Sequence, residues 1–178
     1  MKKRIIALGL LWCLSAVMLQ AARVDTVLVR SAAMNKDVKV VYVLPDKAIG
    51  KQACPVVYLL HGYGGNARSW VQLKPELPQM ADEKGIIFVC PDGKNSWYWD
   101  SPENPAYRYE TFVTSELVKY TDGNYATIPD SKARAISGLS MGGHGALWSA
   151  IRHKDVFGAA GSMSGGAVSY THLRAHET

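Results

Sequence analysis

The sequence predicts an α/β fold, with a mostly parallel β-sheet and helices on both of its faces. Apolar runs of strand length alternate with segments that carry apolar residues at helical spacing. The 178 residues are 48% hydrophobic and 20% charged, which excludes disordered, collagen-like and disulfide-rich classes. Glycine and proline are spread between the apolar runs, so no linker divides the chain and one domain is expected.

The amino terminus predicts a secretory signal peptide over residues 1–22. Residues 2–4 are Lys-Lys-Arg, residues 5–19 are uncharged and mostly apolar, and small residues follow at 21–22. A membrane anchor is the alternative, but a spanning helix needs about 18 or more consecutive apolar residues. The expected location is therefore secreted or periplasmic, with no stable membrane span.

Charge gives little indication of a nucleic-acid partner. Three of the five net positive charges belong to the predicted leader, and no Lys/Arg run with interleaved aromatic residues follows it. We expect no nucleic acid to bind.

The cysteines are expected to stay unpaired. Cys13 belongs to the leader, Cys54 precedes the strand predicted over residues 56–60, and Cys90 ends the strand predicted over residues 86–90. In adjacent parallel strands these two thiols lie on the order of 15 Å apart, beyond disulfide distance.

The first half of the domain predicts four strands. Residues 26–30 and 38–44 are rich in β-branched residues and flank the polar segment 35–37. The apolar runs 56–60 and 86–90 suit strands buried on both faces. Between these two runs, Pro75 and Pro78 limit any helix.

The second half continues the alternation after a loop rich in aromatic residues. The elements predicted are a helix over 109–120 ended by residues 122–124, a strand over 133–137, a helix over 142–153 and a strand over 157–163.

The segment Gly138-Leu139-Ser140-Met141-Gly142 matches the G-x-S-x-G nucleophile elbow between a predicted strand and a predicted helix. The sharp turn strains Ser140 and exposes its hydroxyl, while a Cβ at Gly138 or Gly142 would collide with neighbouring backbone. The helix N-terminus directs unpaired N–H groups at Ser140, so the N–H of Met141 is one expected oxyanion donor.

A second glycine cluster, His-Gly-Tyr-Gly-Gly at residues 61–65, follows an earlier strand. It suits the loop that supplies the other oxyanion donor, expected to be the N–H of Tyr63, with Gly64 beside the substrate. The alternative is that both glycine clusters are only tight turns. The two clusters follow predicted strands in the order expected along the chain, which disfavours this alternative.

By these motifs the chain resembles the α/β-hydrolase superfamily. It is most similar to the esterase branch that includes S-formylglutathione hydrolase (esterase D), tributyrin esterase, feruloyl and acetyl xylan esterases, enterochelin esterase and the antigen 85 mycolyltransferases. The resemblance spans about residues 24–167 and is carried by residues 59–66, 91–93 and 138–147. It implies that Ser140 is the nucleophile, that Met141 and Tyr63 form the oxyanion hole, and that no cofactor or metal takes part. Neither H-E-x-x-H nor C-x-x-C occurs to suggest a metal site.

The other two members of a catalytic triad are not evident. In this fold the acid and the histidine follow the serine along the chain. His144, His153 and Asp155 belong to the helix after the elbow or its end, where a structural role is expected.

Two later histidines fall in a segment that does not continue the family pattern. His172 and His176 lie in residues 169–178, which resemble translated sequencing adaptor. We therefore expect residues 23–168 to be the amino-terminal part of a hydrolase domain, missing the last strands, the acid and the histidine, and inactive as this fragment.

The expected function is serine carboxylic-ester hydrolysis of short-chain acyl or carbohydrate esters, through an acyl-enzyme at Ser140. Trp97 and Trp99 could stack on a sugar or a phenolic acid, with packing of the loop as the alternative. The oligomeric state stays open.

Three other functions are weighed against it. An acyltransferase of the antigen 85 type and a non-catalytic binding relative share every residue named so far. A dinucleotide-binding domain would use the G-x-G-x-x-G/A match at residues 62–67 and Asp92, but Pro75 and Pro78 interrupt the helix it needs.

Overall fold

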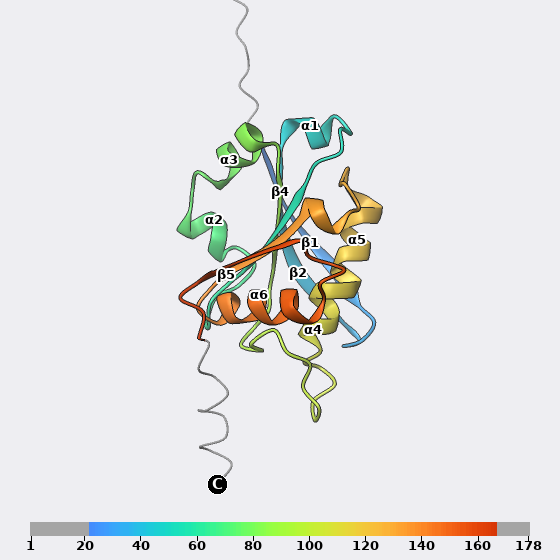
Figure 1. Cartoon of the computed structure of the whole chain (residues 1–178), viewed down its shortest axis with the longest axis vertical. Coiled ribbons are helices and arrows are strands. Elements are labelled where there is room, and N and C mark those ends of the chain that lie inside the picture. The colour runs from blue at the N-terminus through green and yellow to red at the C-terminus, as the bar shows by residue number, and fades with distance from the viewer. Residues whose placement is uncertain (1–21, 167–178) are drawn as a thin grey trace, which may run out of the picture.

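The structure is a computed structural model that describes residues 22–166, a twisted sheet between two layers of helices (Figure 1). The strands are β1 (Arg23–Ser31), β2 (Lys36–Leu44), β3 (Val56–Leu60), β4 (Ile87–Pro91), β5 (Arg134–Leu139) and β6 (Ala159–Met163). The α-helices are α1 (Asp46–Ile49), α2 (Ser69–Leu73), α3 (Leu77–Lys84), α4 (Tyr109–Thr111), α5 (Leu117–Asn124) and α6 (Met141–Arg152). A π-helical turn, η1 (Phe112–Glu116), joins α4 to α5, and a 3-10 turn, η2 (Ser131–Ala133), precedes β5.

The sheet has the order β1-β2-β4-β3-β5-β6. β1 and β2 form an antiparallel hairpin, β2 is antiparallel to β4, and β4, β3, β5 and β6 run parallel to one another. The predicted mostly parallel sheet is confirmed. From β3 the chain goes first to one side, to β4, and then to the other, to β5. The loops after β3 and β5 therefore meet at a crevice above the carboxyl ends of the strands, where α/β sheets bind ligands.

Helices cover both faces of the sheet, as predicted. In Figure 1, α2 and α3 lie to the left of the sheet and α5 to the right. The α2–α3 layer buries Ala67, Trp70, Leu77 and Ala81 against one face. The layer of α4, η1, α5 and α6 buries Tyr109, Phe112, Val113, Leu117, Met141 and Ala146 against the other. The prolines act as expected, because α2 ends before Pro75 and Pro78 stands in the first turn of α3.

The helix predicted over residues 109–120 is wrong in two respects. It is interrupted by the π-helical turn η1, and α5 continues through residues 122–124 to a C-cap at Tyr125. Asp122 does not end the helix. Its carboxylate accepts hydrogen bonds from Arg134 and from the hydroxyl of Thr127, both outside the helix. The turn η1 ends at Glu116, whose carboxylate binds the hydroxyl of Ser31 and the N–H of Ala33 in the β1–β2 hairpin.

Cys54 and Cys90 are both free and buried, which confirms the expectation of unpaired thiols. Burial raises the pKa of each thiol. Across residues 22–166 no helix combines the length and apolar character that a membrane crossing requires. The predicted leader, apart from Ala22, and the predicted tail at 169–178 lie outside the described residues.

Candidate active site

Ser140 lies at the junction of β5 and α6 with φ 53° and ψ −116°. A positive φ is unfavourable for a residue that carries a Cβ, so the surrounding structure must hold it in place. Its N–H donates to the carbonyl of Met163 (2.8 Å), and its own carbonyl accepts the N–H of His144 (3.0 Å). The backbone is thus fixed on both sides, while the residue itself is exposed.

Two glycines allow this junction to form. A Cβ on Gly142 would lie 2.7 Å from the carbonyl oxygen of His61 and closer still to that of Leu60. A Cβ on Gly138 would overlap the backbone of Gly142. The first turn of α6 therefore sits directly against the end of β3, as the spacing of the glycines predicts.

The loop after β3 lies against the candidate nucleophile. The position of a Cβ on Gly62 is 3.6 Å from the Cβ of Ser140. Gly64 has φ 76°, and its N–H donates to Oδ1 of Asn95 (2.8 Å), so this amide is used within the protein. Within residues 22–166 the N–H groups of Tyr63 and Met141 have no hydrogen-bond partner. Unpaired N–H groups near a nucleophilic serine can stabilise an oxyanion.

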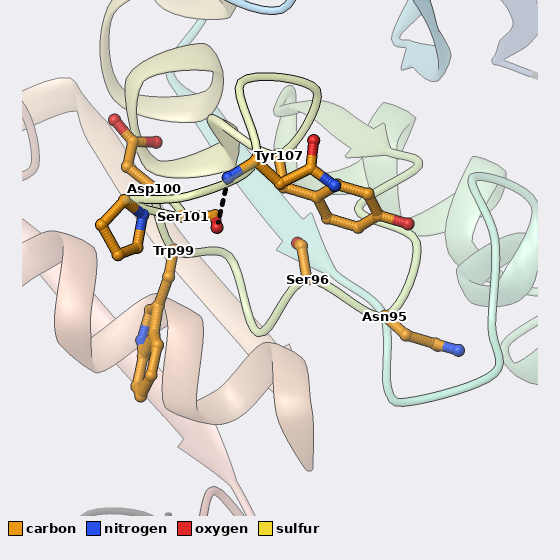
Figure 2. A pocket seen from close by; sticks show the side chains of 8 residues that line it. Asn95, Ser96, Trp99, Asp100, Ser101 and Tyr107 are labelled. Carbon is orange, nitrogen blue, oxygen red and sulfur yellow. Dashed lines mark hydrogen bonds between the residues drawn. The ribbon is translucent and has the colours of Figure 1, made fainter.

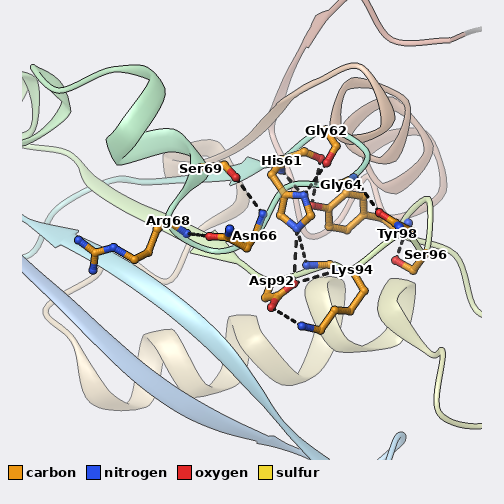
Figure 3. Close-up of polar contacts among 12 residues, drawn as sticks. His61, Gly62, Gly64, Asn66, Arg68, Ser69, Asp92, Lys94, Ser96 and Tyr98 are labelled. Carbon is orange, nitrogen blue, oxygen red and sulfur yellow. Dashed lines mark hydrogen bonds and ion pairs between the residues drawn. The ribbon is translucent and has the colours of Figure 1, made fainter.

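His61 joins this loop to the loop after β4 (Figure 3). Its Nε2 accepts the N–H of Gly93 (2.9 Å), so its proton is on Nδ1 and is donated to the carbonyl of Gly62 (2.7 Å). His61 is therefore neutral, with both ring nitrogens in use. Asp92 lies 3.7 Å from Nε2 and pairs with Lys94 at 2.8 Å. Burial acts to raise the pKa of Asp92, but the side-chain ammonium and the backbone N–H of Lys94 both donate to the carboxylate and hold that pKa well below its usual value.

Tyr98 fills the space between three segments around the site. Its hydroxyl bonds the backbone N–H of His61 (2.9 Å). A Cβ on Gly145 of α6 would lie 2.6 Å from the Tyr98 ring, and one on Gly93 would lie 2.8 Å from its hydroxyl oxygen. Tyr98 is fully buried with φ 60°, which makes it a wedge among the loops after β3 and β4 and helix α6. Sequence reasoning missed this wedge and the support that Asn95 gives to Gly64, and no motif marks either residue.

Trp97 and Trp99 both contact His144 of α6. The indole N–H of Trp99 donates to Nε2 of His144 (2.9 Å), so Nδ1 carries the proton that bonds the carbonyl of Gly166 (3.2 Å). The Trp97 ring meets His144 edge-on at 5.6 Å, and Trp99 also packs on Trp148. These contacts favour the alternative reading of the two tryptophans as packing residues.

Trp99 also borders a hollow of about 350 Å³ in the loop before α4 (Figure 2). Asn95, Asp100 and Tyr107 contribute to its walls. In Figure 2 the indole of Trp99 points toward α6, in agreement with its contacts there. A sugar-stacking role for Trp97 and Trp99 remains a prediction.

The third histidine of residues 22–166, His153, is bound to Glu110. The buried Glu110 carboxylate accepts hydrogen bonds from Trp148 (2.8 Å), Arg152 (2.8 Å) and His153 (2.9 Å), all on or next to α6. Burial acts to raise the pKa of Glu110, but these three donors together lower it below its usual value. The cluster fixes α6 to α4, far along the helix from Ser140.

No group of three or more metal-ligating side chains is gathered anywhere in the described part of the chain. The candidate site is centred on Ser140, with the backbone N–H groups around it and the contacts that hold both loops.

Comparison with known proteins identifies the family. The chain matches the family described as "Putative esterase" over residues 31–171. It is 29% identical to an acetyl esterase of Caldicellulosiruptor saccharolyticus over 136 residues, 71% of this chain and 50% of that protein. It is 34% identical to the diacylglycerol acyltransferase/mycolyltransferase Ag85A of Mycobacterium gordonae, over 79% of this chain and 42% of that protein.

A solved ferulic acid esterase has the same fold, with a TM-score of 0.71, 30% identity, and coverage of 82% of this chain and 61% of the esterase. The chain spans about half the length of the curated relatives it matches. The family match covers most of the chain and agrees with the strand order, the elbow and the glycine loop. The chain belongs to this esterase family, whose members have the α/β-hydrolase fold.

Proposed function

We propose that this chain carries the nucleophile and the oxyanion hole of a serine carboxylic-ester hydrolase. The observation that carries the proposal is Ser140, exposed with a positive φ where β5 enters α6, with the Gly62–Tyr63 loop against it. A strained backbone conformation persists only where the surrounding structure holds it in place. Such positions cluster at functional sites.

The chemistry follows from the geometry. The Oγ of Ser140 adds to the ester carbonyl and loses its proton to a base. The carbonyl oxygen becomes negative and is stabilised by the N–H groups of Tyr63 and Met141 and by the positive end of α6. Collapse of the intermediate breaks the bond to the alcohol, which takes up the proton, and leaves an acyl-enzyme that water hydrolyses.

The base belongs outside residues 22–166. His61 and His144 each use both ring nitrogens, and His153 is held by Glu110. We propose that the histidine and its acid lie on elements beyond β6, and that residues 23–168 are the amino-terminal part of the hydrolase domain. Residues 1–22 are proposed to be a signal peptide of a secreted or periplasmic enzyme, and residues 169–178 a non-native tail.

Acylation tests the nucleophile separately from turnover. The chain is incubated with p-nitrophenyl acetate, and the peptide that carries position 140 is analysed by mass spectrometry. We expect slow acetylation of Ser140, because the oxyanion donors assist it while the base is absent. No adduct is expected there in Ser140→Ala, and an unchanged adduct in Ser164→Ala, a matched control because Ser164 also has a positive φ (52°) and is exposed. Steady turnover should be negligible. An adduct that persists on the same peptide in Ser140→Ala would refute the assignment.

The substrates we propose are short-chain acyl or carbohydrate esters. The acetyl esterase and ferulic acid esterase among the similar proteins support small acyl groups. Similarity to Ag85A favours a second candidate, acyl transfer to an alcohol. Product analysis with competing alcohols, in a chain that includes the base, distinguishes transfer from hydrolysis.

A further inference from the structure

A groove of about 440 Å³ opens next to the loop after β3. Its walls are Gly62 and Tyr63 of the loop, Ser69, Gln72 and Leu73 of α2, and Leu139 of β5. We call it the α2 groove.

The α2 groove begins at the candidate nucleophile. Leu139 immediately precedes Ser140, and a Cβ on Gly62 would be 3.4 Å from the Leu139 carbonyl oxygen and 3.6 Å from the Cβ of Ser140. Tyr63 carries one of the two proposed oxyanion donors. When these donors hold the carbonyl oxygen of an ester, a group attached to the carbonyl carbon can therefore reach the mouth of the groove.

The walls of the groove suit a neutral apolar group. Tyr63 and Leu73 are 66% and 64% exposed, although both carry large side chains with mostly apolar surface. Exposed apolar side chains that gather in a hollow indicate a binding surface. No charged residue lines the groove, and the Ser69 hydroxyl already accepts the N–H of Asn66. The amide of Gln72 and the hydroxyl of Tyr63 are the polar side-chain groups that remain.

The side of the sheet on which the groove lies indicates which part of an ester enters it. The loop after β3 and helix α2 lie on the β3 side of Ser140, and β6 lies on the other side of β5. In serine hydrolysis the alcohol leaves next to the histidine that protonates it. The base is proposed to follow elements beyond β6, so the alcohol faces β6 and the acyl chain faces β3.

We propose that the α2 groove binds the acyl chain, and that Leu73, with Tyr63, determines its length. This inference rests on the proposed function. Because each methylene gains by burial against the apolar walls, the groove favours acyl chains of a few carbons over an acetyl group.

Alkylboronic acids test the groove without turnover. The oxygen of Ser140 adds to boron, its proton passes to water, and the alkyl group takes the position of the acyl chain. Affinities of methyl- to butylboronic acid are measured by chemical-shift titration of the full chain. A fully buried methylene strengthens binding about fourfold. Because the groove is open, we expect at least a tenfold gain from methyl to butyl, with shifts at Tyr63, Leu73 and Leu139.

Three variants complete the test. Leu73→Ser should abolish the gain with chain length, and Leu73→Trp should fill the groove and exclude the butyl compound. Ile151→Ser is the matched control, because Ile151 is 66% exposed on α6 and does not line the groove. It should leave the gain unchanged.

The outcomes separate the two proposals. The groove proposal is wrong if binding depends on Ser140 but not on chain length, or if Leu73→Ser leaves the gain with chain length unchanged. Either result still supports Ser140 as the nucleophile. No binding of any boronic acid overturns both. A gain with chain length that survives Ser140→Ala shows an alkyl site independent of the ester, and overturns the assignment to an acyl chain.

Discussion

Replacing Gly142 by alanine tests the contact on which the elbow depends. A Cβ there would lie 2.7 Å from the carbonyl oxygen of His61 and nearer to that of Leu60, whereas ordinary contacts begin near 3.4 Å. Helix α6 would have to move away from β3 by about 1 Å, and overpacking of this kind costs about 1–3 kcal/mol. Alanine also favours a helix over glycine by up to about 1 kcal/mol. We expect Gly142→Ala to lower the free energy of unfolding by about 1–2 kcal/mol.

Gly123→Ala is the matched control. Gly123 lies in the last turn of α5, and nothing is within 4 Å of the Cβ it would gain. No collision opposes the higher helix propensity of alanine, so this variant should be as stable as the parent chain or up to about 1 kcal/mol more stable. The two variants differ only in what the added methyl group meets.

Urea unfolding followed by circular dichroism and tryptophan fluorescence measures both variants. With a slope of about 1–3 kcal/mol per molar urea, the midpoints of the two variants should differ by about 1 M. If Gly142→Ala unfolds at the same urea concentration as Gly123→Ala, the close approach of α6 to β3 is not what requires glycine.

Further predictions concern the wedge, the buried carboxylate and the thiols. Tyr98→Phe leaves a buried backbone N–H without a partner, so stability should fall by about 1–3 kcal/mol in thermal or urea unfolding; Tyr107→Phe, at a more exposed ring, should change it little. The pKa of Glu110 is lower in the folded chain than in the unfolded chain, so its carboxylate stabilises the fold above about pH 4, and this contribution is lost as the pH falls through the folded value. Stability measured from pH 7 to pH 3 should therefore fall less steeply in Glu110→Gln, and an unchanged slope would contradict this reasoning. Cys54 and Cys90 should resist iodoacetamide in the native chain and react after denaturation, since burial raises both thiol pKa values; rapid native labelling by mass spectrometry would show otherwise.

The features that sequence predicted well are those with a local cause. The strand runs at 56–60 and 86–90 are apolar because both faces of a parallel sheet are covered, and the structure has them as β3 and β4 within one residue. The glycine spacing around Ser140 follows from a collision that any such turn would produce.

The features that sequence could not predict depend on partners distant in the chain. Asn95 supports Gly64 across 31 positions, and Tyr98 reaches His61 across 37. Neither residue type is unusual in a loop. The π-helical turn could not be predicted for the same reason. Glu116, at its end, accepts a hydrogen bond from Ser31 of the hairpin, 85 positions away, and the periodicity of apolar residues does not indicate such a contact.

The wedge formed by Tyr98 has an evolutionary consequence. Gly93 and Gly145 are glycines because this one ring occupies the volume that their side chains would need. The three positions are therefore epistatic. A smaller residue at 98 would release both glycines to vary, and a larger residue at either glycine would select against tyrosine. Among homologues these positions should covary, although they lie on separate loops and a helix and none of them reacts with an ester.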